Sequence, residues 1–345
     1  MFRFMTASAV AMAALAGQAQ AETYSATGVD VVHAAAQLFV IAEDRGDVAV
    51  DIVNSDRVPE VGARLEGGRL VLDGGLGSRI HGCSSGNFLG APAAETVNIW
   101  GGGQVRKEDL PRITLRVPRR MDLTAGGAIF GAIGASAGGR VRISGCGKVT
   151  MGGASGDLDL VQSGSGDLDV GMIDGPLRAR LDGSGDLRIG AAHAGANVDL
   201  NGSGDVHVGD MSGLLTASLD GSGGLNVGNG AQGGELSLNG SGDVRVGAMS
   251  GPLRARLDGS GGLSVVSVQG GAVDLSLMGS GDLVIRGGVA DQLTARLQGS
   301  GELRFAGRAQ ALDADLGGSG DIEIADAGET RHIRDHGSGD VRVGR

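Results

Sequence analysis

The stretch "PLRARLDGSGDLRIG", residues 176–190, decides the fold. Apolar and polar residues alternate on both sides of its GSG turn, with Leu177, Ala179 and Leu181 before the turn and Leu187 and Ile189 after it. Residues that alternate in this way point to opposite faces of a β-strand. The many glycines would destabilise a helix. The stretch therefore predicts two short strands that meet at a tight corner, with the aliphatic side chains inward and the arginines outward.

Near-copies of this stretch recur to the last residues of the chain. The GSG turn begins at Gly164, Gly183, Gly202, Gly221, Gly240, Gly259, Gly279, Gly299, Gly318 and Gly337. A variant, "GCGK", begins at Gly145, and successive turns lie 19 residues apart except for two intervals of 20. One unit cannot fold alone, because its few inward side chains stabilise it by at most about 1.5–3 kcal/mol each while ordering every residue costs about 1–2 kcal/mol. Units must stack, so the sequence predicts an all-β chain that forms a parallel β-helix with about 19 residues per coil.

Side-chain size alternates from one repeat to the next. Four residues before successive turns stand Ala179, Val198, Ala217, Leu236, Ala255, Leu275 and Ala295. Two residues further back the order of sizes is reversed, with Leu177, Ala196, Leu215, Gly234, Leu253, Val273 and Leu293. This alternation lets neighbouring layers interdigitate. It leaves open a structural unit of 38 residues, which is two repeats of 19.

The first residues have the pattern of a secretory signal. Arg3 is followed by the apolar stretch "TASAVAMAALAG" and by the small-residue cleavage sequence at 19–21. We expect residues 1–21 to be removed. No later apolar run is long enough to span a bilayer, so we expect no transmembrane segment in the mature chain. These features predict an exported protein in the periplasm or at the cell surface.

The segment before the repeats has a different pattern. "QLFVIAEDRGDVAVDIV" (37–53) and "VGARLEGGRLVLDGG" (61–75) are typical of hairpins, and "PRITLRVP" (111–118) is typical of a further strand. We interpret residues 22–120 as an N-terminal β region that caps the solenoid, and residues 121–345 as the repeat array. A cap would cover an edge that is otherwise available for aggregation.

The chain has two cysteines, Cys83 and Cys146. Disulfides persist in exported proteins, so a Cys83–Cys146 bond is the favoured hypothesis. It would tie the N-terminal region to the first clear turn of the array. Two separate thiols or metal ligands are the alternative, although no second Cys or His lies at metal-ligand spacing.

The net charge is −11, and about −12 after the predicted loss of Arg3. This sign argues against nucleic acid as a partner, because phosphate recognition needs Lys and Arg. It also argues against electrostatic attachment to an anionic membrane.

The alternating N-terminal strands, a strand that ends "ITLRVP" and the repeated "GSGDL" together resemble the bacterial head GIN-domain family of putative auto-transporter adhesins. The resemblance implies an exported parallel β-helix with a role in adhesion or surface binding. It supplies no catalytic residues, and we expect no cofactor.

The residue after GSG is the main candidate for chemistry. It is acidic at Asp167, Asp186, Asp205, Asp243, Asp282, Asp321 and Asp340, as well as at Glu302. A calcium ladder would need carboxylates at every coil, but Gly224 and Gly262 interrupt the row. Asp also stabilises turns by accepting hydrogen bonds from backbone amides. We therefore favour the structural role, and calcium binding is the alternative.

Other candidates have a simpler structural interpretation. His332, Asp335 and His336 could hold a metal but are typical of an exposed end, and "RGD" at 45–47 is typical of a turn. The charged columns are Arg180, Asp199, Arg256, Arg296, Asp315 and Arg334. These columns predict a solvated face, with a polar contact surface as the alternative.

An enzyme is the more distant hypothesis. A polysaccharide lyase or hydrolase needs a singled-out pair of carboxylates or a base with a cationic clamp. Here acidic residues occur in every coil, and the array after residue 145 has one aromatic residue, Phe305. The sequence therefore predicts a non-enzymatic adhesin or surface-binding module with a cell-surface or envelope partner. A periplasmic structural protein of the envelope is the alternative.

Overall fold

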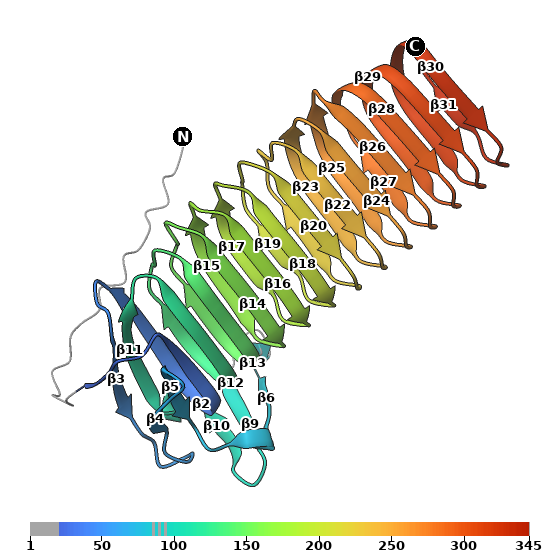
Figure 1. Ribbon diagram of the computed structural model, residues 1–345. Helices are drawn as coiled ribbons and strands as arrows, with labels where there is room; N and C mark the ends of the chain where they lie inside the picture. The colour runs from blue at the N-terminus through green and yellow to red at the C-terminus, as the bar shows by residue number, and fades with distance from the viewer. Residues whose placement is uncertain (1–20, 85–86, 89–90, 93–94, 345) are drawn as a thin grey trace.

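The computed structural model describes residues 21–84, 87–88, 91–92 and 95–344, which form a parallel β-solenoid of about 12 turns (Figure 1). About 19 residues make one coil, so one sequence repeat is one coil. This confirms the predicted fold class. The predicted signal peptide lies outside the described residues, except for Ala21.

Each coil has two strands that meet at the GSG corner. We call the strands that end at this corner the first face, and the strands that begin after it the second face. Each strand pairs in parallel with the equivalent strand one coil later, so that Leu181 pairs with Leu200 on the first face and Leu187 with Val206 on the second.

The strands β2 and β12–β31 divide into three groups. Those of the first face are β14 (Leu158–Gly164), β16 (Leu177–Gly183), β18 (Ala196–Gly202), β20 (Leu215–Leu219), β22 (Gly234–Leu238), β24 (Leu253–Leu257), β26 (Ala272–Leu277) and β28 (Gly288–Leu297). Those of the second face are β15 (Asp167–Ile173), β17 (Leu187–Ala192), β19 (Val206–Val208), β21 (Gly224–Val227), β23 (Asp243–Ser250), β25 (Gly262–Gln269), β27 (Asp282–Ile285) and β31 (Val341–Val343). Longer strands that continue from one face to the other are β2 (Gly28–Glu43), β12 (Met121–Ile133), β13 (Gly139–Met151), β29 (Glu302–Leu316) and β30 (Asp321–Asp335).

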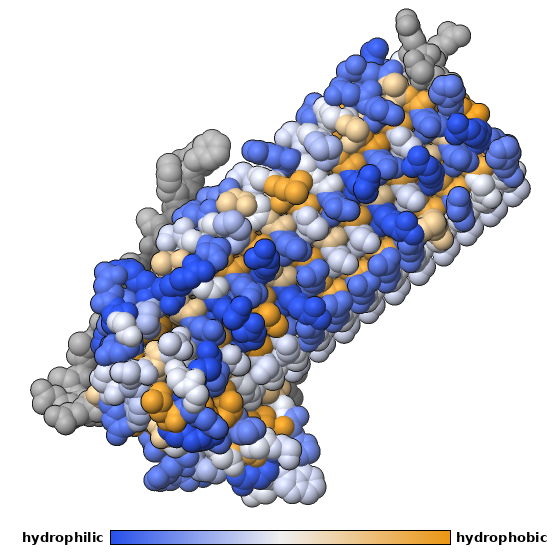
Figure 2. Space-filling model, viewed as in Figure 1, coloured by the Kyte–Doolittle hydropathy of each residue, from blue (hydrophilic) through white to orange (hydrophobic). Residues whose placement is uncertain are grey.

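The core is a continuous column of aliphatic side chains between the two faces. Leu177, Ala179, Leu181, Leu187 and Ile189 are all buried, as the alternation predicts. Large and small residues of successive coils are paired in register, for example Leu177 with Ala196 on the next coil. Figure 2 shows the outward side chains as a largely polar surface with rows of apolar residues between them.

The glycines of the GSG corners are required by close approach between coils. The carbonyl oxygen of Gly221 accepts hydrogen bonds from the backbone N–H groups of Ser241 and Gly242 on the next coil, at 3.0 and 3.2 Å. A Cβ atom on Gly240 would lie 2.1 Å from that same oxygen, and one on Gly242 would lie 2.0 Å from the oxygen of Gly223. Only glycine fits at both positions. The same contacts recur along the solenoid, which explains why the repeat is so regular.

The solenoid begins before residue 120. Strand β5 (Arg69–Asp73) pairs in parallel with the first part of β2, and β11 (Arg112–Pro118) pairs in parallel with its last part. Antiparallel strands pair with the exposed edges of this first coil. Strand β4 (Gly62–Glu66) pairs with β5, β3 (Val48–Val53) pairs with β11, and β1 (Glu22–Tyr24) pairs with β3.

One predicted hairpin is confirmed and the other is wrong. Strands β4 and β5 form the hairpin expected in 61–75. In 37–53, however, β2 and β3 do not pair with each other, because β11 lies between them and pairs with both. Inserting β11 buries Ile113 and Leu115 completely. The "RGD" segment is the connection between β2 and β3, where the side chains of Arg45 and Asp47 are hydrogen-bonded to each other at 2.7 Å.

The corner contact makes a direct prediction. The substitution Gly240→Ala should lower the free energy of unfolding by about 1–3 kcal/mol, because the new methyl group must displace backbone. Gly287→Ala is the matched control, since nothing lies within 4 Å of the position of its Cβ atom. Denaturant titration of both variants checks this. Equal effects of the two substitutions would contradict the close-approach explanation.

Candidate functional site

Residues 74–111 leave the repeating path at the position where later coils have a GSG corner. They connect β5 on the first face to β11 on the second. Their main feature is a three-stranded antiparallel sheet of β6 (Ile80–Ser84), β9 (Thr96–Ile99) and β10 (Gly103–Arg106), which we call the side sheet. The segment also contains the short elements η1 (Gly77–Arg79), β7 (Asn87–Phe88), β8 (Ala91–Pro92) and η2 (Lys107–Asp109).

The side sheet packs against the outside of the first coils. There the outward positions are apolar, and Ala128 and Phe130 of β12 are buried against Val97 and Ile99 of β9 in a second, smaller core. The sequence "GGAIFGAI" explains this arrangement, because its apolar residues serve two cores, with Ile129 pointing into the solenoid.

A disulfide holds the side sheet in place. Cys83 of β6 is bonded to Cys146 of β13, and their Cα atoms are 5.7 Å apart. Cys146 stands where later corners have serine, so the bond joins the side sheet to the edge of the solenoid. The cysteines bridge 63 residues of sequence.

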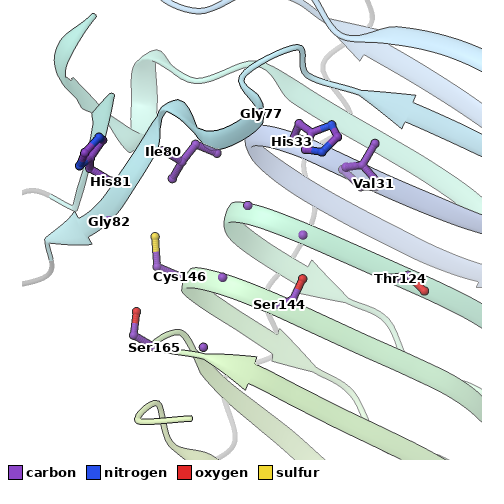
Figure 3. A pocket seen from close by; sticks show the side chains of 15 residues that line it. Val31, His33, Gly77, Ile80, His81, Gly82, Thr124, Ser144, Cys146 and Ser165 are labelled. Atoms are coloured by element: carbon purple, nitrogen blue, oxygen red, sulfur yellow. The ribbon is translucent and has the colours of Figure 1, made fainter. Parts of the chain in front are cut away.

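Between the side sheet and the first corners lies a hollow of about 590 Å³. Figure 3 shows Ile80 and His81 of β6 on one side, and Ser144, Cys146 and Ser165 of the corners on the other. Val31 and His33 of β2 and Thr124 of β12 also line it. Its volume falls in the range of about 300–1,000 Å³ that is typical of small-molecule sites.

A β-bulge brings His33 to this hollow. Val32 and His33 of β2 lie opposite the single residue Gly126 of β12. His33 has a φ of 51° and is the one described non-glycine residue with positive φ. Bulges re-aim side chains, and strained backbone concentrates at functional sites.

Asp73 supports the bulge. Its Oδ1 lies 3.4 Å from Nδ1 of His33 and accepts the N–H of Gly75 at 3.0 Å. The Gly75 N–H, with smaller contributions from Arg64 and His33, holds the pKa of Asp73 below its usual value against the opposing effect of burial. The carboxylate therefore stabilises the fold above the usual carboxyl pKa, and this contribution is lost as the pH falls through the lowered pKa.

The hollow has the groups of a binding site. It offers imidazoles, hydroxyls and glycine backbone, but in the part of the chain that the structure describes none of its hydroxyls is hydrogen-bonded to a histidine ring. A nucleophile paired with a base is the usual arrangement for covalent catalysis. His33 and His81 belong to no sequence motif and were not among the predicted site residues.

The carboxylates after GSG lie in a column beside the corners. Most of them accept a backbone N–H from the equivalent position one coil later. At 2.7–3.3 Å, Oδ1 of the first residue accepts the N–H of the second in the pairs Asp167 and Asp186, Asp186 and Asp205, Asp205 and Gly224, Asp243 and Gly262, Asp282 and Glu302, and Asp321 and Asp340. Each of these Oδ1 atoms therefore links two coils. This geometry supports the structural role, although the link runs between coils rather than within one turn.

The described residues contain no group of three or more His, Cys, Asp or Glu side chains that could hold one metal ion. His332, Asp335 and His336 are exposed near the end of β30.

The charged columns of the first face are engaged in ion pairs. Arg180 pairs with Asp182 at 2.6 Å, and Arg256 pairs with Asp258 at 2.7 Å. Arg296 and Arg334 reach aspartates of other coils, Asp274 and Asp313, at 3.0 and 3.3 Å. Asp199 and Asp315 lie in the same column, in register with Arg180 and Arg334.

The role of the carboxylate column can be tested at Asp205, whose Oδ1 accepts the N–H of Gly224 at 2.7 Å. Asp205→Ala should lower stability by about 1 kcal/mol, because it leaves this amide without its acceptor. Asp205→Asn should have little effect, since an amide oxygen also accepts. Thermal melting in calcium and in chelator checks the alternative. A calcium ladder would require that both variants lose stability and that chelator lowers the midpoint of the wild type.

Among the described residues, no helix has the length and apolar character needed to cross a membrane.

Comparison with known proteins finds a similarity over part of the chain. Residues 234–344, from β22 to the residue after β31, match the model of the family described as putative auto-transporter adhesin, head GIN domain. No curated protein matches the chain. The matched segment consists of regular coils, and the side sheet lies outside it. The family resemblance that the GSGDL repeats predict is therefore confirmed for residues 234–344.

Proposed function

We propose that this protein is an exported, non-enzymatic binding protein that acts as an adhesin or surface-binding module. The side sheet and its hollow make the contact, and the solenoid serves as a rigid spacer. The partner is a component of a cell surface or of the envelope. The family description of residues 234–344 supports an adhesive role.

One observation carries the proposal. The regular coil is replaced at one corner by a non-repeating segment, which the Cys83–Cys146 disulfide fixes over a hollow of about 590 Å³. Binding residues are typically found on irregular segments that a rigid scaffold positions. Here the strained His33 of β2 and the exposed His81 of β6 both line the hollow that such a segment covers.

The solenoid suits the role of spacer. Its coils are joined by a continuous parallel hydrogen-bonded ladder and by the corner contacts, so a load at one end is carried by backbone hydrogen bonds along the whole stack. A disulfide that ties the binding segment to this stack fits an oxidising, exported location.

A periplasmic scaffold is the second candidate. The observation that favours it is the first face, where Arg180, Arg256, Arg296 and Arg334 form a long charged surface. Such a surface could contact other envelope components along its length.

Protease treatment of intact cells separates the two candidates. We expect the protein to be degraded on intact cells, and a deletion strain to attach less well to its surface than the strain with the gene restored. A periplasmic marker protein that survives the treatment is the control for cell integrity. Full protection of the protein, with degradation only after permeabilisation, would contradict the adhesin proposal and favour the scaffold.

A further inference from the structure

The side sheet carries the single tryptophan of the chain. Trp100 follows β9 in the turn to β10, and its side chain is exposed, with 71% of the residue surface accessible. Only 2% of the residues of this protein are aromatic. Phe130 and Phe305 are fully buried, and Tyr24 and Phe39 are partly buried. An indole held in solvent in so aromatic-poor a chain marks a place of contact, because tryptophan is enriched among the residues that dominate binding energy.

The indole is held in a defined position. The backbone N–H of Trp100 donates to the carbonyl oxygen of Arg79 at 2.8 Å. The indole stacks on the imidazole of His81, with ring centroids 5.4 Å apart and 24° between the ring planes. His81 thus packs against one side of the indole, and most of the remaining side chain is exposed to solvent. Because His81 also lines the large hollow, the two regions adjoin.

A second, smaller hollow of about 250 Å³ lies beside the indole. Its lining includes Trp100, Asp56, Arg57, Arg79 and Ile99. This volume is below the range of about 300–1,000 Å³ typical of drug-sized ligands, so it suits one ring-sized group.

The charged side chains of this hollow differ in whether they have hydrogen-bond partners within the protein. Arg79 donates to the carbonyl oxygens of Leu76 and Gly75, at 3.2 and 2.6 Å, which fixes its guanidinium. In the described part of the chain, the carboxylate of Asp56 and the guanidinium of Arg57 make no hydrogen bond or ion pair. Two arginines and one aspartate give the hollow a net positive charge in a protein whose net charge is −11.

We propose that this hollow binds a saccharide ring that carries a carboxylate, as in a hexuronate. Sugar rings have an apolar face of C–H groups, which stack on the electron-rich face of an indole. The planar guanidinium of Arg57 matches a carboxylate in bidentate geometry, and Asp56 accepts hydrogen bonds from hydroxyls on the ring. A neutral sugar would leave the arginine charge without a counter-ion, and a cationic ligand would meet two like charges.

This inference rests on the proposed binding function and names the ligand class of its side-sheet site. It leaves the large hollow at His33 free to accommodate a neighbouring part of the same glycan.

Trp100 is also the reporter for the test. Because the chain has one tryptophan, its emission reports on this site alone. We expect trigalacturonic acid to change the emission of the purified full chain saturably, and neutral galactotriose to bind at least about tenfold more weakly, since a charged pair is lost. The binding should weaken as salt is added.

Variants locate the site. Calorimetric titration with trigalacturonic acid should show affinity reduced about tenfold or more for Trp100→Ala and for Arg57→Gln. Leu214→Ala is the matched control, because Leu214 is a similarly exposed apolar residue, at 57%, on the solenoid. Trp100→Ala should keep the wild-type melting temperature, because its side chain lies mostly in solvent. That result would show that a loss of binding is local.

Two results would overturn the inference: unchanged affinity of Trp100→Ala for trigalacturonic acid, or no change in Trp100 emission with either saccharide. Equal affinity for the neutral saccharide would overturn the assignment of the carboxylate. The proposed function fails separately. If the Trp100→Ala protein loses saccharide binding but its cells still attach, the saccharide is not the ligand through which the protein attaches, and the adhesin proposal stands. Wild-type protein that binds the saccharide but is protected inside intact cells would contradict only the adhesin proposal.

Discussion

The structure depends on the contact between successive GSG corners. The carbonyl oxygen of the first glycine occupies the place that a side chain of the next coil would need. At most corners it accepts two amides of that coil, as Gly221 does from Ser241 and Gly242. The corner therefore tolerates no Cβ atom at either glycine. The hydrogen bonds between corners, their close packing and the 19-residue period follow from this one arrangement, because the corner of each coil must lie in register with the corner of the previous coil.

Polar side chains beside the corner extend the same stacking. The position before GSG alternates between acid and amide over Asp182, Asn201, Asp220, Asn239 and Asp258. Asn201 donates to Asp182 at 3.1 Å and Asn239 to Asp220 at 2.9 Å, so the alternation avoids stacked like charges. The column ends where Met278 follows Asp258, and there Oδ1 of Asp258 is buried without a hydrogen-bond partner. Elsewhere in the column, the side-chain amide of the asparagine in the next coil supplies the hydrogen bond that this oxygen lacks.

The regular part of the fold can be predicted from sequence because each coil repeats the same local constraints. Alternation around the turn identified the inward residues, and the period identified the coil. Strand β11 could not be placed, because it pairs with β2 and β3 across long stretches of sequence. The side sheet was missed for the same reason. Its signal lies in "GGAIFGAI", where the outward residues Ala128 and Phe130 are also apolar.

Of the candidate site, only the disulfide that holds the side sheet was predicted from the sequence. Cysteine number and export pointed to Cys83 and Cys146, but His33 and His81 have no motif. The structure shows the break at His33: the buried positions run through Val29 and Val31 and then through Ala34 and Ala36, so the alternation changes phase at this point. A change of phase within a strand indicates a bulge. The side chains that lie beside His33 depend on the position of the side sheet, and the local sequence pattern does not specify that position.

Amide hydrogen exchange at the corners tests the central claim most directly. The corner serines are exposed to solvent, as at Ser203, Ser241 and Ser319. Ordinary exposed turns exchange their amides quickly. If the corners are bonded from coil to coil, residue-resolved exchange will show the backbone N–H groups of these serines, and of the glycines that follow, protected to the same degree as the flanking strands. Rapid exchange at the corners beside protected strands would contradict the account.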